Sequence, residues 1–266
     1  AVVAEDVAPN FPLEADFVIT QDDAIGQGGL KTKFKQNLAA IETLKKLQTE
    51  NRVATKDEQK VLAKWVGWGG LSAAFRRADG SVAQGWAKEV EQLEAILSAD
   101  ELQAARESTI AAHYTAPEIV TAMWQAVERM GFKGGRVLEP SVGSGNFIGL
   151  LPKSLRKVTA IYGTELDSIT GGLAQKLYPT ANIKVMGFQD YAVPDGHFKL
   201  AIGNPPFGAI KITDLDRKHL SGLSLHNYFF AKSVDALEDN GVLAMVVTNR
   251  FMDASDKNDR ARAYIA

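Results

Sequence analysis

The stretch Phe198–Phe207, with the sequence FKLAIGNPPF, decides the fold that we expect for this chain. It begins as a short, largely apolar run, which is typical of a buried strand, and this run stops at Gly203. The residues that follow are Asn204, Pro205, Pro206 and Phe207. Because proline lacks a backbone N–H and pushes the residue before it into extended geometry, the sheet cannot continue through this NPPF tetrad. The tetrad therefore lies at the carboxyl end of a strand, where open α/β sheets bind their ligands.

The chemistry of the NPPF tetrad suits a planar amine. The Asn204 amide offers an acceptor and donors, the backbone before and within the proline pair offers rigid carbonyls, and Phe207 offers a flat apolar face. An exocyclic amino group on a base needs acceptors for its hydrogens and a surface on which to stack. Taken alone, the tetrad is better explained as a turn that ends a strand, so its meaning depends on the motifs that accompany it.

The composition is that of an ordinary globular protein, with 266 residues, 45% hydrophobic and 23% charged, enough for one large domain or two smaller ones. The net charge is −2, so any contact with nucleic acid must come from a local basic patch. The absence of cysteine excludes disulfides, thiolate zinc sites and cysteine nucleophiles. The four histidines lack the spacing of metal ligands, so no metal is expected. No membrane span or secretory signal is recognisable, so we expect a cytoplasmic protein without a membrane partner.

Residues 1–110 predict an N-terminal arm followed by a helical region. The first thirty or so positions show no sustained period, and apolar residues at steps of three and four then begin at Phe34. Two pairs have the spacing of capping boxes that open helices: Thr55 with Glu58, and Ser98 with Glu101. A further amphipathic helix is expected over 83–97. The Trp- and Gly-rich stretch 66–71 is better explained as a turn between helices, packed by aromatic rings, than as a ligand-binding loop.

Residues 111–266 predict an α/β, Rossmann-like domain. It opens with a helix for which Thr115 is the expected N-cap, with Pro117 in the first turn. The expected strands are 136–139, 158–163, 183–186, 198–203 and 241–248. The expected helices between them are 146–152, 168–178 and 225–238. Strands separated by helices favour right-handed crossovers and a mostly parallel sheet.

Carboxylates mark three successive strand ends. Glu139 ends the first strand, and the loop after it contains Gly143 and Gly145, which let the backbone approach a ligand closely. This loop lacks the lysine of a Walker motif and the third glycine of the dinucleotide fingerprint. Glu165 ends the second strand and suits ribose hydroxyls, and Asp190 follows the third strand and suits an adenine amino group. S-adenosylmethionine, which has a positive group, a ribose and an adenine, fits this arrangement, and the pyrophosphate of NAD does not.

In this order, the motifs resemble those of the N6-adenine DNA methyltransferases of the amino-methyltransferase superfamily, in particular their gamma class. The matching stretches are HYTAP at 113–117, LEPSVGSGNF at 138–147, GTELD at 163–167, GFQD at 187–190 and GNPPFG at 203–208. The helical region, with VGWGGL at 66–71, further resembles the N-terminal part of very large phage and plasmid proteins that join such a methyltransferase to a helicase-like region. The methyltransferase resemblance covers about residues 110–266, and that of the helical region is less specific.

The resemblance implies roles for individual residues. The implied cofactor-binding set is Tyr114, Thr115, Glu139, Pro140, Gly143, Gly145, Asn146, Phe147, Glu165, Asp190 and Asn204. The implied catalytic set is Asn204, Pro205, Pro206 and Phe207. Asn204 and the Pro205 carbonyl would accept hydrogen bonds from the target N6 amino group, and Phe207 would stack on the base. The methyl group would move by direct in-line displacement, without a metal or a covalent enzyme intermediate.

The resemblance also implies partners and a setting. The expected partner is DNA, either single-stranded or a duplex from which the base is flipped, because a paired base cannot reach such a pocket. The setting would be restriction-modification or anti-restriction, in the cytoplasm of a bacterial host or delivered by a phage. RNA adenine or a protein glutamine amide remains an alternative substrate. A non-catalytic module that binds DNA or a partner chain is the second alternative.

The sequence departs from the family pattern after the fifth expected strand. Sheets of this family finish with an antiparallel pair of strands, and no strand signal follows residue 248. We therefore expect a sheet that lacks its last strands, in a fragment of a larger polypeptide that carries further domains. The segment 209–223, which carries both basic and acidic residues, is expected to be either a mobile loop that contacts phosphates or a solvated loop of mixed charge.

Overall fold

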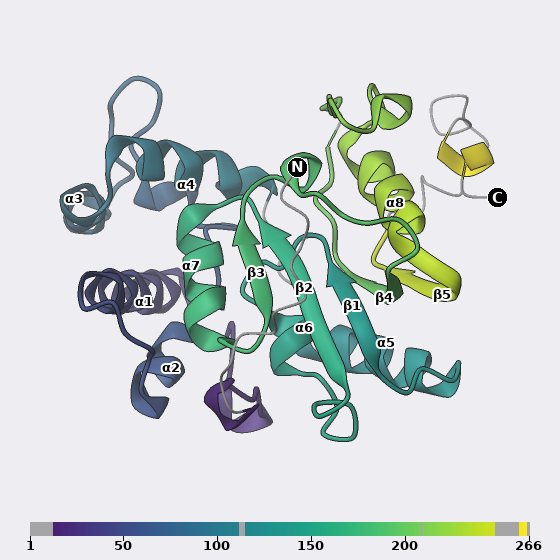
Figure 1. Cartoon of the computed structure of the whole chain (residues 1–266). Helices are drawn as coiled ribbons and strands as arrows, with labels where there is room; N and C mark the ends of the chain where they lie inside the picture. Colours follow the sequence, from purple (N-terminus) through teal and green to yellow (C-terminus); the bar gives the residue numbers. More distant parts are fainter. Residues whose placement is uncertain (1–12, 112–114, 209, 248–260, 265–266) are drawn as a thin grey trace.

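The structure, a computed structural model, describes residues 13–111, 115–208, 210–247 and 261–264, and a parallel sheet forms its centre (Figure 1). The strands are β1 (Gly135–Glu139), β2 (Thr159–Glu165), β3 (Asn182–Val185), β4 (Phe198–Gly203) and β5 (Leu237–Met245). They lie in the order β3-β2-β1-β4-β5, so the chain moves outward from β1 to β3 and then crosses to the other side of β1. This confirms the predicted Rossmann-like sheet, and it creates a switch point between β1 and β4.

Helices precede the sheet and alternate with its strands. The earlier helices are α1 (Leu30–Thr49), α2 (Lys56–Leu62), α3 (Ala87–Ile96) and α4 (Ala99–Ala111). Those of the sheet region are α5 (Pro117–Arg129), α6 (Asn146–Gly149), α7 (Ser168–Leu177) and α8 (Leu225–Ala236). Short 3-10 helices are η1 (Leu13–Ala15), η2 (Gln21–Asp23), η3 (Ser72–Ala74), η4 (Phe188–Asp190) and η5 (Lys218–Leu220). Within the described ranges, no helix combines the length and apolar character that a membrane span requires.

Each face of the sheet has its own hydrophobic core, because successive side chains of a strand point to opposite faces. Val137 of β1 and Leu200 of β4 belong to the larger core, to which α1, α5, α6 and α7 contribute. Leu138 and Ala201, one position further along the same strands, belong to a second core, to which α8 contributes. Burial on both faces is what a parallel sheet requires.

The first four strands lie where the sequence predicted them, and the fifth needs correction. The strand predicted at 241–248 is β5, which begins at Leu237 and includes the last two positions of the predicted helix 225–238. Phe198 pairs with Leu237, and a register shift follows before Leu200 pairs with Val242. Asn240 adopts a left-handed φ of 65° within this irregular part. The residues around Asn240 are polar, so the sequence gives no strand signal at the start of β5.

Two helix predictions were wrong in detail, and proline explains both. Thr115 is not the N-cap of α5, because Pro117 at the first helical position holds Ala116 in extended geometry, and Ala116 therefore becomes the N-cap. The helix predicted at 146–152 ends at Gly149. Pro152 cannot donate a helical hydrogen bond and disfavours helical geometry in the residue before it.

The turn between α2 and η3 is packed by aromatic rings, as predicted for residues 66–71. Trp65 and Trp68 are both buried, with ring centroids 5.3 Å apart in an edge-to-face arrangement. Asn37 of α1 fixes the backbone of the turn, since its side chain donates to the Gly67 carbonyl at 2.6 Å and accepts from the Val66 N–H at 3.0 Å. The turn is therefore a structural element of the helical region.

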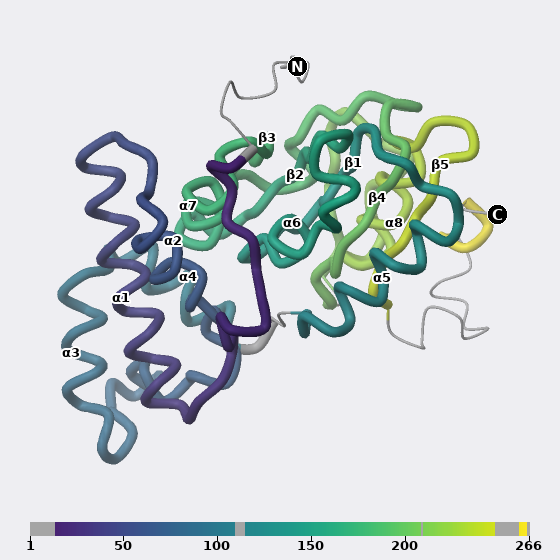
Figure 2. Tube along the Cα trace, turned by 90° about the horizontal axis from the view of Figure 1, so that it is seen from below, coloured from purple at the N-terminus to yellow at the C-terminus, as the bar shows by residue number. Residues whose placement is uncertain are grey.

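The segment 16–19, here called the strap, joins the helical region to the sheet region. Figure 2 shows it as the purple tube that passes beside α6 and α7. Its backbone donates from Phe17 to the Leu177 carbonyl at 2.9 Å and from Ile19 to the Gly149 carbonyl at 3.0 Å. Residues on both sides of position 110 share the larger core. The predicted division into 1–110 and 111–266 stays a prediction, and the two parts pack as one body.

Candidate active site

The carboxyl ends of the strands bring the predicted site residues to one edge of the sheet. Glu139 and Glu165 are the last residues of β1 and β2, and Asp190 ends η4, which follows β3. Asn204 comes directly after β4. β1 lies between β2 and β4, so Glu139 lies between the end of β2, at Glu165, and the end of β4, which Asn204 follows. A Cβ on Gly203 would lie 3.6 Å from Glu139 Cγ, which places the Glu139 side chain against the end of β4.

The loop after β1 holds a tight backbone course that needs glycine. Gly143 and Gly145 have φ values of 56° and 79°, in the left-handed region. A Cβ on Gly145 would lie 2.3 Å from Cε2 of Tyr178, so a larger residue would clash with that ring. Thr164 of β2 anchors the loop, because its hydroxyl donates to the Pro140 carbonyl at 2.8 Å and its carbonyl accepts from the Val142 N–H at 2.9 Å.

Glu165 contacts this loop directly, which the sequence did not indicate. One carboxylate oxygen accepts from the Gly143 N–H at 2.9 Å, and the other accepts from the Asp167 N–H at 2.9 Å. Burial raises the pKa of Glu165 to about 7, although these two N–H groups act in the opposite direction. The side chain therefore fixes the loop after β1, and its oxygens keep further lone pairs for ligand hydroxyls.

Glu139 is a buried carboxyl that lacks a full set of partners. The residue is only 1% exposed, and its Oε2 has no hydrogen-bond partner within the described residues. Burial raises the pKa of Glu139 well above its usual value, and the charge of Glu165 acts in the same direction. A buried acceptor without a donor is unfavourable in the free protein. It fits a ligand that brings a cationic donor, such as the amino group of S-adenosylmethionine.

Thr115 lies beside the loop after β1, although it does not cap α5. The Asn146 side-chain amide donates to the Thr115 carbonyl at 3.1 Å, and the Ser144 hydroxyl donates to Asn146 Oδ1 at 3.0 Å. Tyr114 lies outside the described residues. Phe147 is 3% exposed and packs in the larger core, and its carbonyl accepts from Trp124 Nε1 at 3.0 Å. The cofactor-binding roles of these residues stay predictions.

The aromatic residue of the NPPF tetrad stacks on a histidine. The rings of Phe207 and His226 have centroids 5.4 Å apart and planes at 27°. His226 in turn stacks on Phe230, at 5.0 Å and 26°. Burial lowers the pKa of His226, which favours the neutral ring. The stack was not predicted from the sequence, although the i, i+4 spacing of His226 and Phe230 on a predicted helix places both rings on one face.

Asp214 organises the described residues 210–224, in which Lys211, Asp216 and Lys218 are exposed, and the choice between the two expectations for 209–223 stays open. The buried Asp214 carboxylate accepts from the N–H groups of Asp216 at 2.9 Å and Arg217 at 2.7 Å, and from the Tyr228 hydroxyl of α8. Arg217 forms ion pairs with Asp195 at 2.5 Å and Asp235 at 2.8 Å. Its guanidinium is thus already engaged, and a phosphate contact from this segment would have to come from an exposed lysine.

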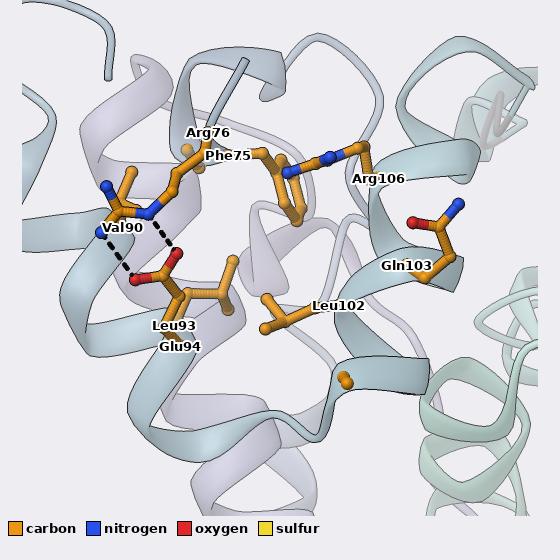
Figure 3. Close-up of a pocket in the computed structure, with 10 residues that line it drawn as sticks. Phe75, Arg76, Val90, Leu93, Glu94, Leu102, Gln103 and Arg106 are labelled. Carbon is orange, nitrogen blue, oxygen red and sulfur yellow. Dashed lines mark hydrogen bonds and ion pairs between the residues drawn. The ribbon is translucent and has the colours of Figure 1, made fainter. Parts of the chain in front are cut away.

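A separate cavity of about 230 Å³ lies in the helical region (Figure 3). Its apolar lining includes Phe75 and Leu93, and its rim carries Arg106 and an Arg76–Glu94 pair with N–O distances of 2.6 and 2.9 Å. None of the predicted cofactor or catalytic residues lines it. The chemistry that the sequence predicts therefore lies at the edge of the sheet, and the cavity belongs to the packing of η3, α3 and α4.

The raised pKa of Glu165 predicts a pH-dependent stability. Between its ordinary pKa of 4.5 and the value of about 7, the folded state holds a proton that the unfolded state releases. The free energy of unfolding therefore falls as the pH rises through this window. We expect Glu165→Gln to lose this part of the slope, which amounts to at most about 3 kcal/mol. Urea unfolding of both proteins at several pH values from about 4.5 to 8 measures it, and equal slopes would contradict the assignment.

The architecture defines a class of protein. The sheet order and the helices that cover it give the Rossmann-like fold that S-adenosylmethionine-dependent methyltransferases share. A solved structure that shares the fold is the methyltransferase subunit of a type I restriction-modification system from Streptococcus thermophilus. It is 16% identical, with a TM-score of 0.50, and the match covers 86% of this chain and 59% of that chain.

Sequence comparisons find similarity to methyltransferases of restriction-modification type. Residues 154–266 match the family described as Eco57I restriction-modification methylase. The type II methyltransferase M.TthHB8I of Thermus thermophilus is 30% identical over 140 residues, which are 47% of this chain and 32% of that protein. The defense against restriction protein B of Escherichia phage P1 is 26% identical over 151 residues, which are 56% of this chain and 6% of that protein. The chain is thus similar, over parts of its length, to methyltransferases of restriction-modification type, and it spans a third or less of these relatives' length.

Proposed function

We propose that this chain transfers a methyl group from S-adenosylmethionine to the N6 amino group of adenine in DNA. The observation that carries the proposal is the placement of the NPPF tetrad directly after β4, beside the buried Glu139 carboxyl at the end of β1. A site for a cationic donor and a site for a planar amine therefore adjoin each other at the switch point of the sheet. The resemblance to restriction-modification methylases supports DNA as the polymer.

The proposed cofactor site uses the carboxylates of successive strand ends. Glu139 would accept from the methionine amino group, and Glu165 would accept from the ribose hydroxyls while it holds Gly143 in place. Asp190, which is exposed at the end of η4, would lie beside the adenine ring. The bound cofactor supplies an electrophilic methyl group on a sulfonium. The protein residues supply orientation and electrostatic support for the transfer.

The proposed target site is the NPPF tetrad. The Asn204 side chain and the Pro205 carbonyl would accept hydrogen bonds from the N6 amino group, which raises electron density on that nitrogen and aims its lone pair at the methyl carbon. Phe207, whose ring is supported by His226, would stack on the base. The tetrad lies at the carboxyl edge of the sheet, where a base that is paired within a duplex could not reach it. The base would therefore have to be flipped out of the duplex or come from a single strand.

Methyl transfer from isotope-labelled S-adenosylmethionine tests the proposal. Duplex DNA, single-stranded DNA, RNA and a glutamine-containing protein acceptor are compared, and digested nucleosides are analysed for N6-methyladenine. Label in N6-methyladenine of DNA is the expected result. Label only in RNA or in protein would replace the substrate that we propose. Binding of the cofactor without transfer to any acceptor would favour a module that requires the further domains of a larger polypeptide, and absence of binding would overturn the proposal.

A further inference from the structure

Lys232 of α8 is a buried cation with a complete set of acceptors. It is 2% exposed, and its ammonium donates to the carbonyls of Phe188 at 2.8 Å and Gln189 at 3.2 Å and to the Asp214 carboxylate at 3.3 Å. An ammonium has three N–H donors, so these contacts use all of them. Burial lowers the pKa of Lys232, while the Asp214 carboxylate acts in the opposite direction.

The two carbonyls belong to η4, which ends at Asp190. The Phe188 ring adds to the attachment, because it packs against Phe229 of α8 at 5.0 Å between centroids. The Lys232 ammonium also lies 5.1 Å from the centroid of the Phe188 ring. The position of η4, and with it the place of Asp190 at the carboxyl edge of the sheet, is therefore set by α8.

The third acceptor belongs to the segment that follows the NPPF tetrad. Asp214 organises residues 210–224 through backbone N–H groups and binds α8 through Lys232 and the Tyr228 hydroxyl. The same helix carries His226, on which Phe207 stacks. One helix thus touches the proposed adenine end of the cofactor site and the proposed target side.

A buried ion pair of this kind is weak evidence for a stabilising role. Apolar side chains of similar volume often stabilise a core as well or better, whereas removal of one charge alone is strongly destabilising. The distinctive property of Lys232 is that a single ammonium bonds two segments that are 25 or more positions apart, Phe188 and Gln189 on one side and Asp214 on the other. This property makes the contact a means of fixing their relative positions.

We propose that Lys232 is a positioning residue that couples the cofactor's adenine subsite to the segment 210–224 on the target side. It holds η4 through two carbonyls and the segment 210–224 through Asp214. Cofactor bound at the adenine subsite therefore favours the conformation of the segment 210–224 that binds the target, and the target favours cofactor binding in return. The identity of the two ligands rests on the proposed function. The mechanical part, that Lys232 fixes η4, is independent of it.

Three variants separate positioning from simple charge pairing: Lys232→Met, Asp214→Asn and the two combined. Each single change leaves a buried charge with less compensation, and we expect a lower melting temperature for both. The double variant buries neither charge, and we expect it to recover most of the loss. If the single variants fail to fold, the double variant alone carries the test.

The decisive readouts concern the double variant. We expect its dissociation constant for S-adenosylhomocysteine to rise at least about tenfold, because η4 has lost its donors. A duplex oligonucleotide should tighten that constant in the wild-type protein by about fivefold or more, which is typical of coupled sites, and should have little effect in the double variant. Asn37→Ala, which removes a buried polar side chain from the helical region, is the matched control and should keep wild-type affinity.

Hydrogen exchange provides a readout that needs no ligand. The amides of Asp190 and Tyr191 donate to the carbonyls of Gly187 and Phe188 within η4. We expect them to exchange faster in the double variant than in the wild type, and at the wild-type rate in Asn37→Ala. Unchanged exchange in the double variant would overturn the positioning role of Lys232. If exchange is faster in the double variant but the wild-type protein binds no cofactor, the proposed function is overturned. In that case Lys232 still positions η4, but the coupling between the two sites is excluded.

Discussion

Replacement of Asn204 by alanine is expected to lower the rate of methyl transfer by about a thousandfold, with less than about a threefold change in the dissociation constant of S-adenosylmethionine. The reason is the place of Asn204 directly after β4, where its amide would accept from the target amino group as that nitrogen attacks. Loss of one preorganised polar group at a reacting atom removes stabilisation that is specific to the transition state. Single-turnover transfer from labelled cofactor, with a separate binding titration, measures both quantities.

Asn182→Ala is a suitable control for this experiment. Asn182 is the first residue of β3, at the opposite edge of the sheet from the proposed site, and the same change of side chain is made there. We expect transfer within about twofold of the wild-type rate. An equal loss of transfer and of cofactor binding in Asn204→Ala would show that Asn204 acts on the cofactor and would remove the role that we assign to it.

Replacement of Glu139 by glutamine is expected to stabilise the free protein and weaken cofactor binding at the same time. At about pH 8 the carboxyl is ionised in the unfolded chain, whereas burial in the folded protein, with Oε2 unpartnered, opposes its ionisation; a neutral amide does not carry this penalty. We expect the free energy of unfolding to rise by about 1–3 kcal/mol. The loss of a charge-assisted hydrogen bond to the cofactor should weaken binding by about 10- to 150-fold.

Urea unfolding and equilibrium binding, both near pH 8, test the two effects of Glu139→Gln. Glu94→Gln provides the comparison, since it neutralises a glutamate whose partner, Arg76, lies on the surface of the helical region. That variant should lose a little stability and keep wild-type affinity. A less stable Glu139→Gln protein with unchanged affinity would mean that the carboxyl is needed for the fold and does not face the cofactor.

The sheet was predictable from the sequence because its signals are local. β1, β2 and β4 contain short apolar runs, β3 gives a weaker signal, and β4 has the predicted bounds. The gathering of Glu139, Glu165, Asp190 and Asn204 at one edge of the sheet was predictable for a related reason, since the carboxyl ends of parallel strands share one edge. The start of β5 was not predictable, because its first residues pair with Phe198 in spite of a polar sequence.

What the sequence did not reveal depends on contacts between distant segments. The bond from the Gly143 N–H to Glu165 joins two strand ends, and no local pattern marks it. No local pattern in the sequence marks Lys232, and only the fold shows that its ammonium is enclosed by η4 and Asp214. The N-cap of α5 was predicted wrongly for a local reason. Thr115 belongs to a residue type that commonly caps helices, but the extended geometry that Pro117 imposes on Ala116 makes Ala116 the N-cap.

The strap sets an order of events while the chain is being synthesised. Asp16 accepts a hydrogen bond from the backbone N–H of Thr180, 164 positions later in the chain. Because ribosomes add about 5–20 residues per second, Thr180 is synthesised on the order of ten seconds after Asp16. During that interval α1 and α2 can already form and pack against each other. Ile19 can bond to the Gly149 carbonyl once α6 has been made, whereas Phe17 can bond to the Leu177 carbonyl only after α7 has been made. A nascent chain therefore keeps Phe17 exposed to chaperones until about two thirds of this sequence has left the ribosome.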